Sequence, residues 1–231
     1  MSVTNGVHHL AICTRDIKKQ IEYFTDVVGM ELVALYWMHG VTRTFHGFLK
    51  MGESSSIAFV QSLDAPEVKP VKGVSHAGTT AGNVAPGAMQ HLAINVDSYD
   101  DLMAIRDRVR SRGVWIMGPL DHGFCKSIYL AAPEGIMLEF STSEGQAIDA
   151  EAWIDPEVQK LAGINDSELA RFKRPASFAS KGGTVPQPAR DTSKPIMEFR
   201  ADDPIWTMSD AEVTRRMSET TPPVAPKVKA A

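Results

Sequence analysis

The sequence predicts an α+β fold built from two similar units and followed by an irregular, partly helical extension. The letters His-Leu-Ala-Ile occur at 9–12 and again at 91–94, an offset of 91 − 9 = 82 residues. Each copy is followed by a polar step and then by apolar residues at helical spacing, with strand-like runs after the helix. We therefore expect an internal repeat of strand, helix and three strands, spanning about Gly6–Leu63 and Gly87–Ser143.

The first unit opens with a strand over 6–14. Asp16 is a plausible N-cap for a helix over 17–28, and Gly29 is suited to end that helix because glycine adopts the left-handed conformation without strain. Alternation and β-branched or aromatic residues then predict three strands, at 30–38, 42–50 and 56–61.

A link over 62–88, rich in proline, glycine and small residues, joins the two units and contains His76. Loops of this length in compact domains are typically functional or mobile. The second unit then predicts a strand at 91–96, a helix at 99–112, and strands at 113–117, 127–130 and 136–141. Gly118-Pro119 is expected to end the strand at 113–117, and Pro133-Glu134-Gly135 has the composition of a tight turn.

The character of the chain changes after Ser143. We expect residues 1–143 to form the paired domain and 144–231 to form an extension. One or two short helices are predicted within 154–173 and another within 205–217. The stretch 175–195 is rich in Ser, Gly, Pro and Lys and predicts an extended or disordered segment. This extension is expected to wrap the core or a partner subunit.

Composition narrows the range of functions. With 43% hydrophobic and 23% charged residues, the 231-residue chain has the composition of a soluble globular protein. A net charge of −4 gives no electrostatic basis for nucleic-acid binding, and no apolar run is long enough for a membrane span. Two cysteines in unrelated contexts and the lack of an export signal predict a cytoplasmic protein with free thiols.

Glu139 is the residue that most needs an explanation. It lies in the apolar run Ile136–Ser141, where a carboxylate is costly unless it is paired or bound to a metal. At the matching place in the first unit the chain has Ala58, so only the second unit carries a carboxylate. Solvent exposure at a sheet edge is the alternative for Glu139. Of the adjacent His8 and His9, which point to opposite faces of a strand, His9 is preferred because its context repeats at His91.

The paired units, the two His-Leu-Ala-Ile strands and the closing Tyr-x-x-x-Pro-x-Gly-x-x-x-Glu motif resemble the vicinal oxygen chelate superfamily, which includes glyoxalases, bleomycin-resistance proteins and extradiol dioxygenases. The resemblance covers about residues 6–143 and implies two βαβββ modules whose sheets curve into one cup around a metal. The closing motif resembles the extradiol dioxygenase signature through His122, Tyr129, Pro133, Gly135 and Glu139. Leu120 departs mildly from that signature.

The resemblance implies that His9, His91 and Glu139 hold a non-haem Fe(II), with Mn(II) as the alternative metal. Two imidazoles and one carboxylate on one face of an octahedral ion leave positions open for a catechol and for O₂. By the same resemblance, Tyr129 hydrogen-bonds a substrate oxygen and His122 supports the site from behind the ligands. His76, 91 − 76 = 15 residues before His91, acts as acid–base. Tyr129 is also a good strand residue in its own right.

An extradiol dioxygenase that cleaves a catechol-like ring is therefore the function that the resemblance favours. The expected partners are a small aromatic diol and O₂, without nucleic acid or membrane, in a homo-oligomer. A glyoxalase- or epimerase-type lyase or isomerase is the first alternative, but such enzymes place a second Glu near the end of the first module, where this chain has Ala58. A non-catalytic drug-binding protein of the same fold is the second alternative.

Overall fold

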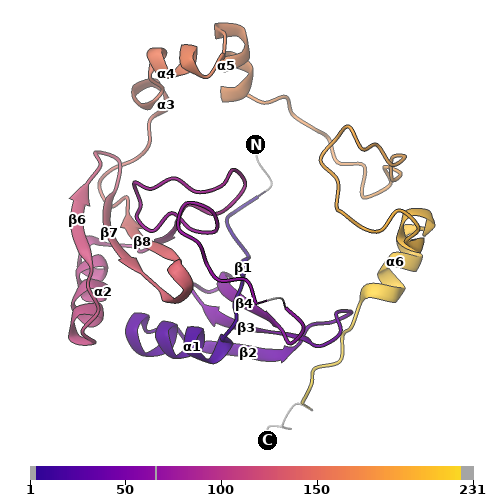
Figure 1. Cartoon of the computed structure of the whole chain (residues 1–231). Coiled ribbons are helices and arrows are strands. Elements are labelled where there is room, and N and C mark those ends of the chain that lie inside the picture. The colour runs from indigo at the N-terminus through magenta and orange to yellow at the C-terminus, as the bar shows by residue number, and fades with distance from the viewer. Residues whose placement is uncertain (1–3, 66, 225–231) are drawn as a thin grey trace, which may run out of the picture.

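The computed structural model describes residues 4–65 and 67–224, and the predicted repeat is present in it (Figure 1). The first module consists of a strand, a helix that continues into a π-helical turn, and three more strands: β1 (His9–Cys13), α1 (Ile17–Glu22), η1 (Tyr23–Val28), β2 (Leu32–Trp37), β3 (Thr44–Lys50) and β4 (Ser56–Ser62). The second module repeats the order: β5 (Leu92–Asn95), α2 (Tyr99–Ser111), β6 (Met117–Asp121), β7 (Lys126–Ala131), the 3₁₀ turn η2 (Pro133–Gly135) and β8 (Met137–Thr142).

Local chemistry explains the ends of the helices. The side chain of Asp16 accepts a hydrogen bond from the backbone N–H of Lys19 at 3.0 Å, and Gly29 ends η1 with φ 97°. Both predicted helix boundaries of the first module are thus confirmed. Ser98 caps α2 in the same way by accepting from Asp101 N.

Each module contributes one four-stranded mixed sheet. The strand orders are β1-β4-β3-β2 and β5-β8-β7-β6, so the two sheets have the same topology. In each, the first and last strands of the module pair in parallel and the others pair antiparallel. The structure therefore has two sheets of four strands, and β1 and β5 are the edge strands at corresponding places.

The predicted strand at 113–117 is wrong, because the strand β6 begins only at Met117 and runs through Gly118 and Pro119. Proline lacks an N–H group and usually ends a strand, but it is tolerated at a sheet edge. β6 is such an edge, and its pairing with β7 shifts register between Met117 and Leu120. The proline therefore sits within the strand at an irregularity instead of ending it.

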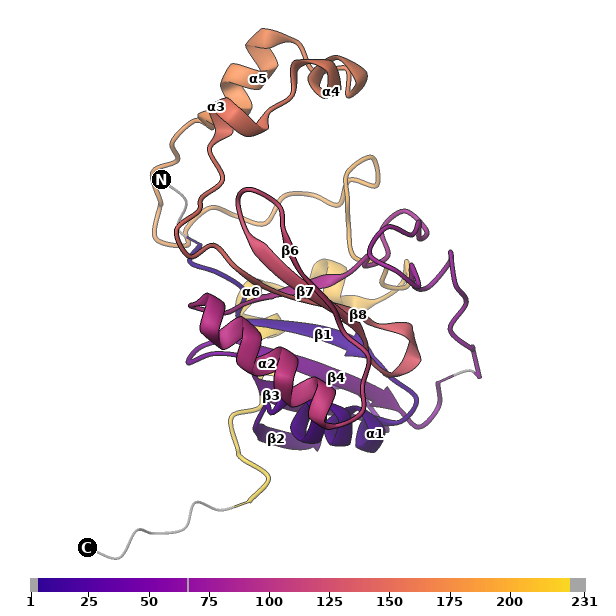
Figure 2. The same ribbon diagram turned by 90° about the vertical axis from the view of Figure 1, so that its left-hand side faces the viewer.

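One hydrophobic core joins the modules. Helix α1 packs on β3 and β4, while α2 packs on β7 and β8, as Figure 2 shows. The buried core draws on both modules, with Phe24, Phe59, Leu102, Leu138 and Phe140 among its most buried members. We call the face of each sheet that is turned away from its helix the open face of that sheet.

Three polar side chains also cross between the modules. Glu134, in the turn before β8, accepts from Thr14 Oγ1 at 2.7 Å and from Gln20 Nε2 at 2.9 Å. Tyr23 donates to the carbonyl of Ala131 at 2.8 Å. Arg108 of α2 donates to carbonyls at the end of η1. Because an ionised carboxylate and a guanidinium make strong hydrogen bonds, these contacts hold the modules in register.

The extension leaves the core as an arc of short helices and loops (Figure 1). Its elements are α3 (Ala150–Trp153), α4 (Pro156–Leu161), α5 (Asp166–Lys173), η3 (Pro204–Thr207) and α6 (Asp210–Met217). The predicted helices within 154–173 and 205–217 are confirmed. The stretch 175–195 contains neither helix nor strand. Residues 225–231 of the predicted extension lie outside the described residues, and the division of the chain at 143 stays a prediction.

Candidate metal centre

The register of the sheets shows which residues occupy matching places in the two modules. Ala58 pairs with Ala11 in β1, and Glu139 pairs with Ala93 in β5. Each of these alanines lies two residues after the histidine of its repeat, His9 or His91. Ala58 therefore occupies the place in the first module that Glu139 occupies in the second.

The strands next to β4 and β8, namely β3 and β7, also differ between the modules in polarity. Phe48 pairs with Ala58, and Tyr129 pairs with Glu139. One step along, the first module has Val60 where the second has Ser141. The open face of the second sheet is therefore polar at three places where that of the first is apolar.

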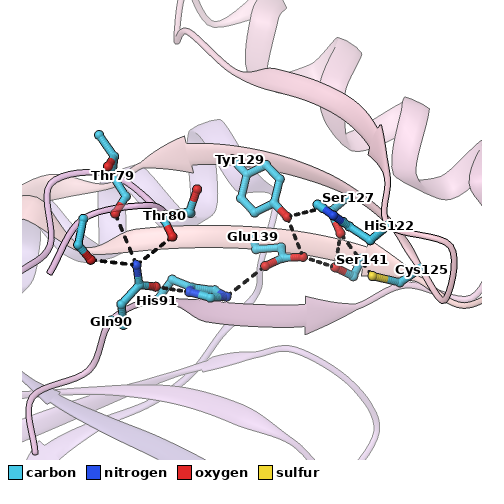
Figure 3. Close-up of polar contacts among 11 residues, drawn as sticks. Thr79, Thr80, Gln90, His91, His122, Cys125, Ser127, Tyr129, Glu139 and Ser141 are labelled. Atoms are coloured by element: carbon cyan, nitrogen blue, oxygen red, sulfur yellow. Dashed lines mark hydrogen bonds and ion pairs between the residues drawn. The ribbon is translucent and has the colours of Figure 1, made fainter. Parts of the chain in front are cut away.

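In the second module the polar side chains form one connected cluster (Figure 3). His91 Nε2 lies 2.9 Å from Glu139 Oε2. The other carboxylate oxygen, Oε1, accepts from Ser141 Oγ at 2.6 Å and from the Tyr129 hydroxyl at 3.1 Å. His122 Nε2 lies 2.7 Å from the Tyr129 oxygen. Because Tyr129 donates its proton to Glu139, its oxygen is free to accept from His122.

The cluster keeps Glu139 ionised and Tyr129 protonated. Burial alone would raise the pKa of Glu139, but hydrogen bonds from the hydroxyls of Ser127, Ser141 and Tyr129 outweigh it and lower that pKa. Burial, aided by the charge of Glu139, raises the pKa of Tyr129. Glu139 is only 7% exposed, so its charge depends on these donors.

Gln90 determines which nitrogen of His91 faces Glu139. Its amide nitrogen lies 2.7 Å from the carbonyl of Thr80, 3.1 Å from that of Gly82 and 3.4 Å from that of Thr79. Carbonyls only accept, so the amide oxygen must point the other way, where it contacts Nδ1 of His91. That oxygen also only accepts, so Nδ1 carries the proton.

A neutral His91 protonated at Nδ1 presents a lone pair at Nε2 to a carboxylate oxygen 2.9 Å away. Two acceptors at that distance repel unless a proton or a cation lies between them. Two neighbouring donors of one octahedral ion, each about 2.1 Å from it, are about 3 Å apart. The donor types and spacing of His91 and Glu139 therefore fit a divalent metal ion.

The third predicted ligand lies elsewhere. His9 is exposed on β1, where its Nδ1 is 2.9 Å from Nδ1 of His8 and its ring packs edge-on against Phe48. Among residues 4–65 and 67–224, no group of three or more His, Cys, Asp or Glu side chains gathers closely enough to hold a metal. The structure thus brings two of the three predicted ligands together, and His9 as the third stays a prediction.

His76 lies beside the turn Pro133–Gly135. A Cβ atom on Gly135 would be 2.6 Å from Cγ and Nδ1 of His76, so the ring packs directly on the glycine backbone. Nδ1 of His76 is buried without a hydrogen-bond partner among the described residues. No contact joins His76 to Glu139 or His91 in that part of the chain, so its predicted acid–base role stays a prediction.

A cavity of about 480 Å³ begins next to the cluster. Met89 and Met137 line it, and each lies two residues before a member of the cluster, His91 or Glu139. Met137 and Glu139 share a face of β8, because side chains two apart on a strand point the same way, so the cavity is one step along that strand from Glu139. Its other walls come from β1, the 62–88 link and the η2 turn, and include Leu10, Ile12, Cys13, Val68, His76 and Ile136.

Three members of the cluster were missing from the sequence prediction, namely Ser127, Ser141 and Gln90. Ser141 shares a strand face with Glu139, so alternation alone could have indicated it. For Gln90 the only sequence signal is its place before His91, matched by His8 before His9.

Comparison with known families identifies a superfamily for the part of the chain that holds the paired modules. A family model described as the Glyoxalase/Bleomycin resistance protein/Dioxygenase superfamily matches residues 6–140. No protein with a curated description matches the chain. Within the described residues, no helix is long and apolar enough to cross a membrane.

Several solved structures are similar in fold. A glyoxylase/bleomycin resistance protein/dioxygenase domain from Frankia sp. EAN1pec is 16% identical, with a TM-score of 0.48, over 61% of this chain and 98% of that one. The antibiotic binding protein TnmS3 from Streptomyces sp. CB03234 is 17% identical, with a TM-score of 0.43, over 62% and 99%. A point mutant of the fosfomycin resistance protein FosX from Listeria monocytogenes, complexed with Mn(II) and 1S,2S-dihydroxypropylphosphonic acid, is 13% identical, with a TM-score of 0.40, over 65% and 98%. At these values the similarity says nothing about substrate.

Proposed function

The chain belongs to the Glyoxalase/Bleomycin resistance protein/Dioxygenase superfamily, and from that premise we propose that it is an extradiol-type dioxygenase that opens a catechol-like ring with O₂. His91 and Glu139 would hold a divalent metal ion, Fe(II) or Mn(II), and the repeat assigns His9 as the third ligand. When bound, such an ion supplies neighbouring positions at which the two oxygens of a catechol and dioxygen can meet.

The observation that carries this proposal is the asymmetry between the modules. Ala58 occupies the place of Glu139, so the repeat offers three donors and not four. A set of three leaves room for two reactants on an octahedral ion. A second carboxylate, as in the lyase alternative, would take one of those positions. The lyase and isomerase alternative is therefore less well supported than the dioxygenase.

The chain's own residues would place and deprotonate the substrate. The cavity beside Met89 and Met137 has mainly apolar walls and a volume typical of a small-molecule site. A diol held at His91 and Glu139 could extend its ring substituent into that cavity. His76 lines the cavity, and its Nδ1 has no hydrogen-bond partner within residues 4–65 and 67–224. An imidazole can accept a hydroxyl proton near neutral pH.

The test is oxygen uptake by the metal-loaded full chain. Protein purified without oxygen, loaded with Fe(II) and mixed with substituted catechols should consume one O₂ per substrate and form a yellow ring-opened product. His91→Ala should lose metal and uptake together, because one of two adjacent donors is gone. Full metal occupancy in that variant would show that the ligand assignment is wrong.

Two other results would replace the proposal. If no catechol drives uptake, while the thiol adduct of a ketoaldehyde is isomerised without oxygen, the protein is a lyase or isomerase. If neither reaction occurs, and an aromatic compound binds equally well with and without metal, the protein is a binding protein. The second outcome has one observation in its favour, because the described residues bring only two metal donors into contact.

A further inference from the structure

Gln90 is placed to do two things with one amide group. Its oxygen contacts Nδ1 of His91, and its nitrogen faces the carbonyls of Thr79, Thr80 and Gly82 (Figure 3). An amide has a defined donor end and a defined acceptor end. The loop therefore orients the amide, and the amide in turn orients the imidazole.

The loop held by Gln90 is the one that carries His76. Inside it, the N–H of Ala85 donates to the carbonyl of Val74 at 3.2 Å, and the N–H of Gly73 donates to the carbonyl of His76 at 2.8 Å. These two backbone hydrogen bonds connect the segment after 79–82 with the segment that contains His76, so anchoring 79–82 also restrains His76. Val68, Ser75 and His76 of the same link also line the cavity.

We propose that Gln90 is a positioning residue that fixes the tautomer of His91 and, through the same amide, anchors the loop that carries His76. The metal-ligand pair and the cavity wall are then coupled, because loosening the loop frees the amide that orients His91. The inference goes beyond the proposed function, since it concerns the state of the protein before any metal or substrate binds.

Three substitutions separate the two roles. Gln90→Leu removes both. Gln90→Glu can still accept from Nδ1 of His91 but cannot donate to the loop carbonyls. Gln90→Lys can donate to those carbonyls but cannot accept from the imidazole. The matched control is Gln159→Leu, because Gln159 also ties a loop by donating to Ile164 O at 3.2 Å and Asp166 Oδ1 at 3.0 Å, far along the chain in the extension.

Two readouts are made on the metal-free full chain. The first is ¹⁵N NMR of the His91 ring at a pH high enough to leave histidines neutral, which reports the protonated nitrogen. The second is hydrogen exchange of the peptide over 79–82. The wild type should carry its proton on Nδ1 in a larger share of molecules than Gln90→Leu, because without the amide oxygen the Glu139 carboxylate, 2.9 Å from Nε2, is the stronger acceptor. Gln90→Leu should show a tautomer mixture and exchange at least about tenfold faster, as expected when two hydrogen bonds are lost.

The separating variants should split these effects. Gln90→Glu should keep the wild-type tautomer with fast loop exchange, and Gln90→Lys should show the tautomer mixture with slow exchange. Gln159→Leu should change neither readout. Titration with Mn(II) should then show affinity about 10–100-fold lower in Gln90→Lys than in Gln90→Glu, because the orientation of a ligating imidazole is lost.

Three results would overturn the inference. One is a wild type in which the share of His91 protonated at Nδ1 is no larger than in Gln90→Leu. Another is wild-type behaviour of Gln90→Leu in both readouts. The third is equal change in the Glu and Lys variants, which would mean that Gln90 matters only for folding. If Gln90→Leu does not fold, the tautomer and hydrogen-exchange readouts of Gln90→Glu and Gln90→Lys still test the inference. Neither main readout needs metal or catechol, so failure of ring cleavage would leave this test intact.

Discussion

At the scale of single residues, the chemistry depends on the difference between two equivalent places. Glu139 is ionised because hydroxyls surround it, whereas Ala58 faces Phe48 and has no such donors among its strand neighbours. Ala58 is also fully buried. The first module is therefore not a weakened copy of the second. Its open face has aromatic rings in place of the carboxylate cluster, with His9, His46 and Tyr36 around Phe48.

Ala58→Glu should therefore destabilise the metal-free protein, by about 2–4 kcal/mol, because it buries a carboxylate that lacks the hydroxyl donors around Glu139. Mn(II) or Fe(II) should restore part of the lost free energy of unfolding if the new carboxylate reaches the ion, since binding to the folded state stabilises it. Oxygen uptake should fall while metal stays bound. Ala58→Gln is the control of equal size. Equal rescue of both variants by metal would contradict the shared site.

Gly135 offers a second test at this scale. It has φ 80°, and a Cβ atom there would strike the His76 ring. Gly145 has φ 70° but meets nothing within 4 Å, so it is the matched control for backbone strain alone. Gly145→Ala should lose about 1–2 kcal/mol of unfolding free energy from backbone strain, and Gly135→Ala should lose more because the His76 ring must also move. Only Gly135→Ala should also slow ring opening, by at least about tenfold if His76 is the acid–base group. Equal rates in the two variants would remove His76 from the mechanism.

At the scale of elements, the polar contacts of Glu134, Tyr23 and Arg108 join the two modules. Tyr23 makes one of these contacts, through a hydroxyl that can titrate. Burial raises its pKa to about 12 from 10.0, and its hydroxyl donates to the carbonyl of Ala131. The folded state thus favours the protonated phenol more than the unfolded state does. The resulting stability is present in full below pH 10.0 and is lost as the pH rises from there towards about 12.

Urea unfolding at about pH 9 and about pH 11.5 measures this loss. The wild type should lose about 1–2 kcal/mol more than Tyr23→Phe over that interval, after allowance for solvent around a half-buried ring. The Phe variant keeps the packing and has no proton to lose. Parallel losses in the two proteins would mean that the phenol of Tyr23 does not bind its proton more tightly in the folded state.

At the scale of the whole molecule, the extension adds length without adding to the core. None of its helices has a buried residue, and Leu161, Phe178 and Met197 are 80%, 78% and 70% exposed. Trp153 is the extension helix residue that contacts the second module through an aromatic ring, which packs edge-on against Phe124. The paired modules, with their shared core, are complete by the end of β8.

A chain ending at residue 148 should therefore fold, with an unfolding free energy within about 2 kcal/mol of the full chain. Urea denaturation of the two proteins measures the difference. Trp153→Ala in the full chain should account for most of any loss, because the other extension helices bury so little. A truncated chain that does not fold would make the extension part of the core.

The repeat, most of its strands and helices, and the lone carboxylate could all be predicted from the order of residues. They follow from side-chain periodicity, caps and turns, which act over a few residues.

Which polar groups contact one another depends on how the sheets are assembled. Glu139 reaches His91 because β5 and β8 pair in parallel across some 48 residues of chain (139 − 91), and Gln90 finds its carbonyls because a long link folds back. β6 runs through Pro119 because it is an edge strand, a place known only once the sheet is assembled. Local patterns carry no information on such pairings, because the entropy of closing each loop is offset only by the contacts that the finished fold provides.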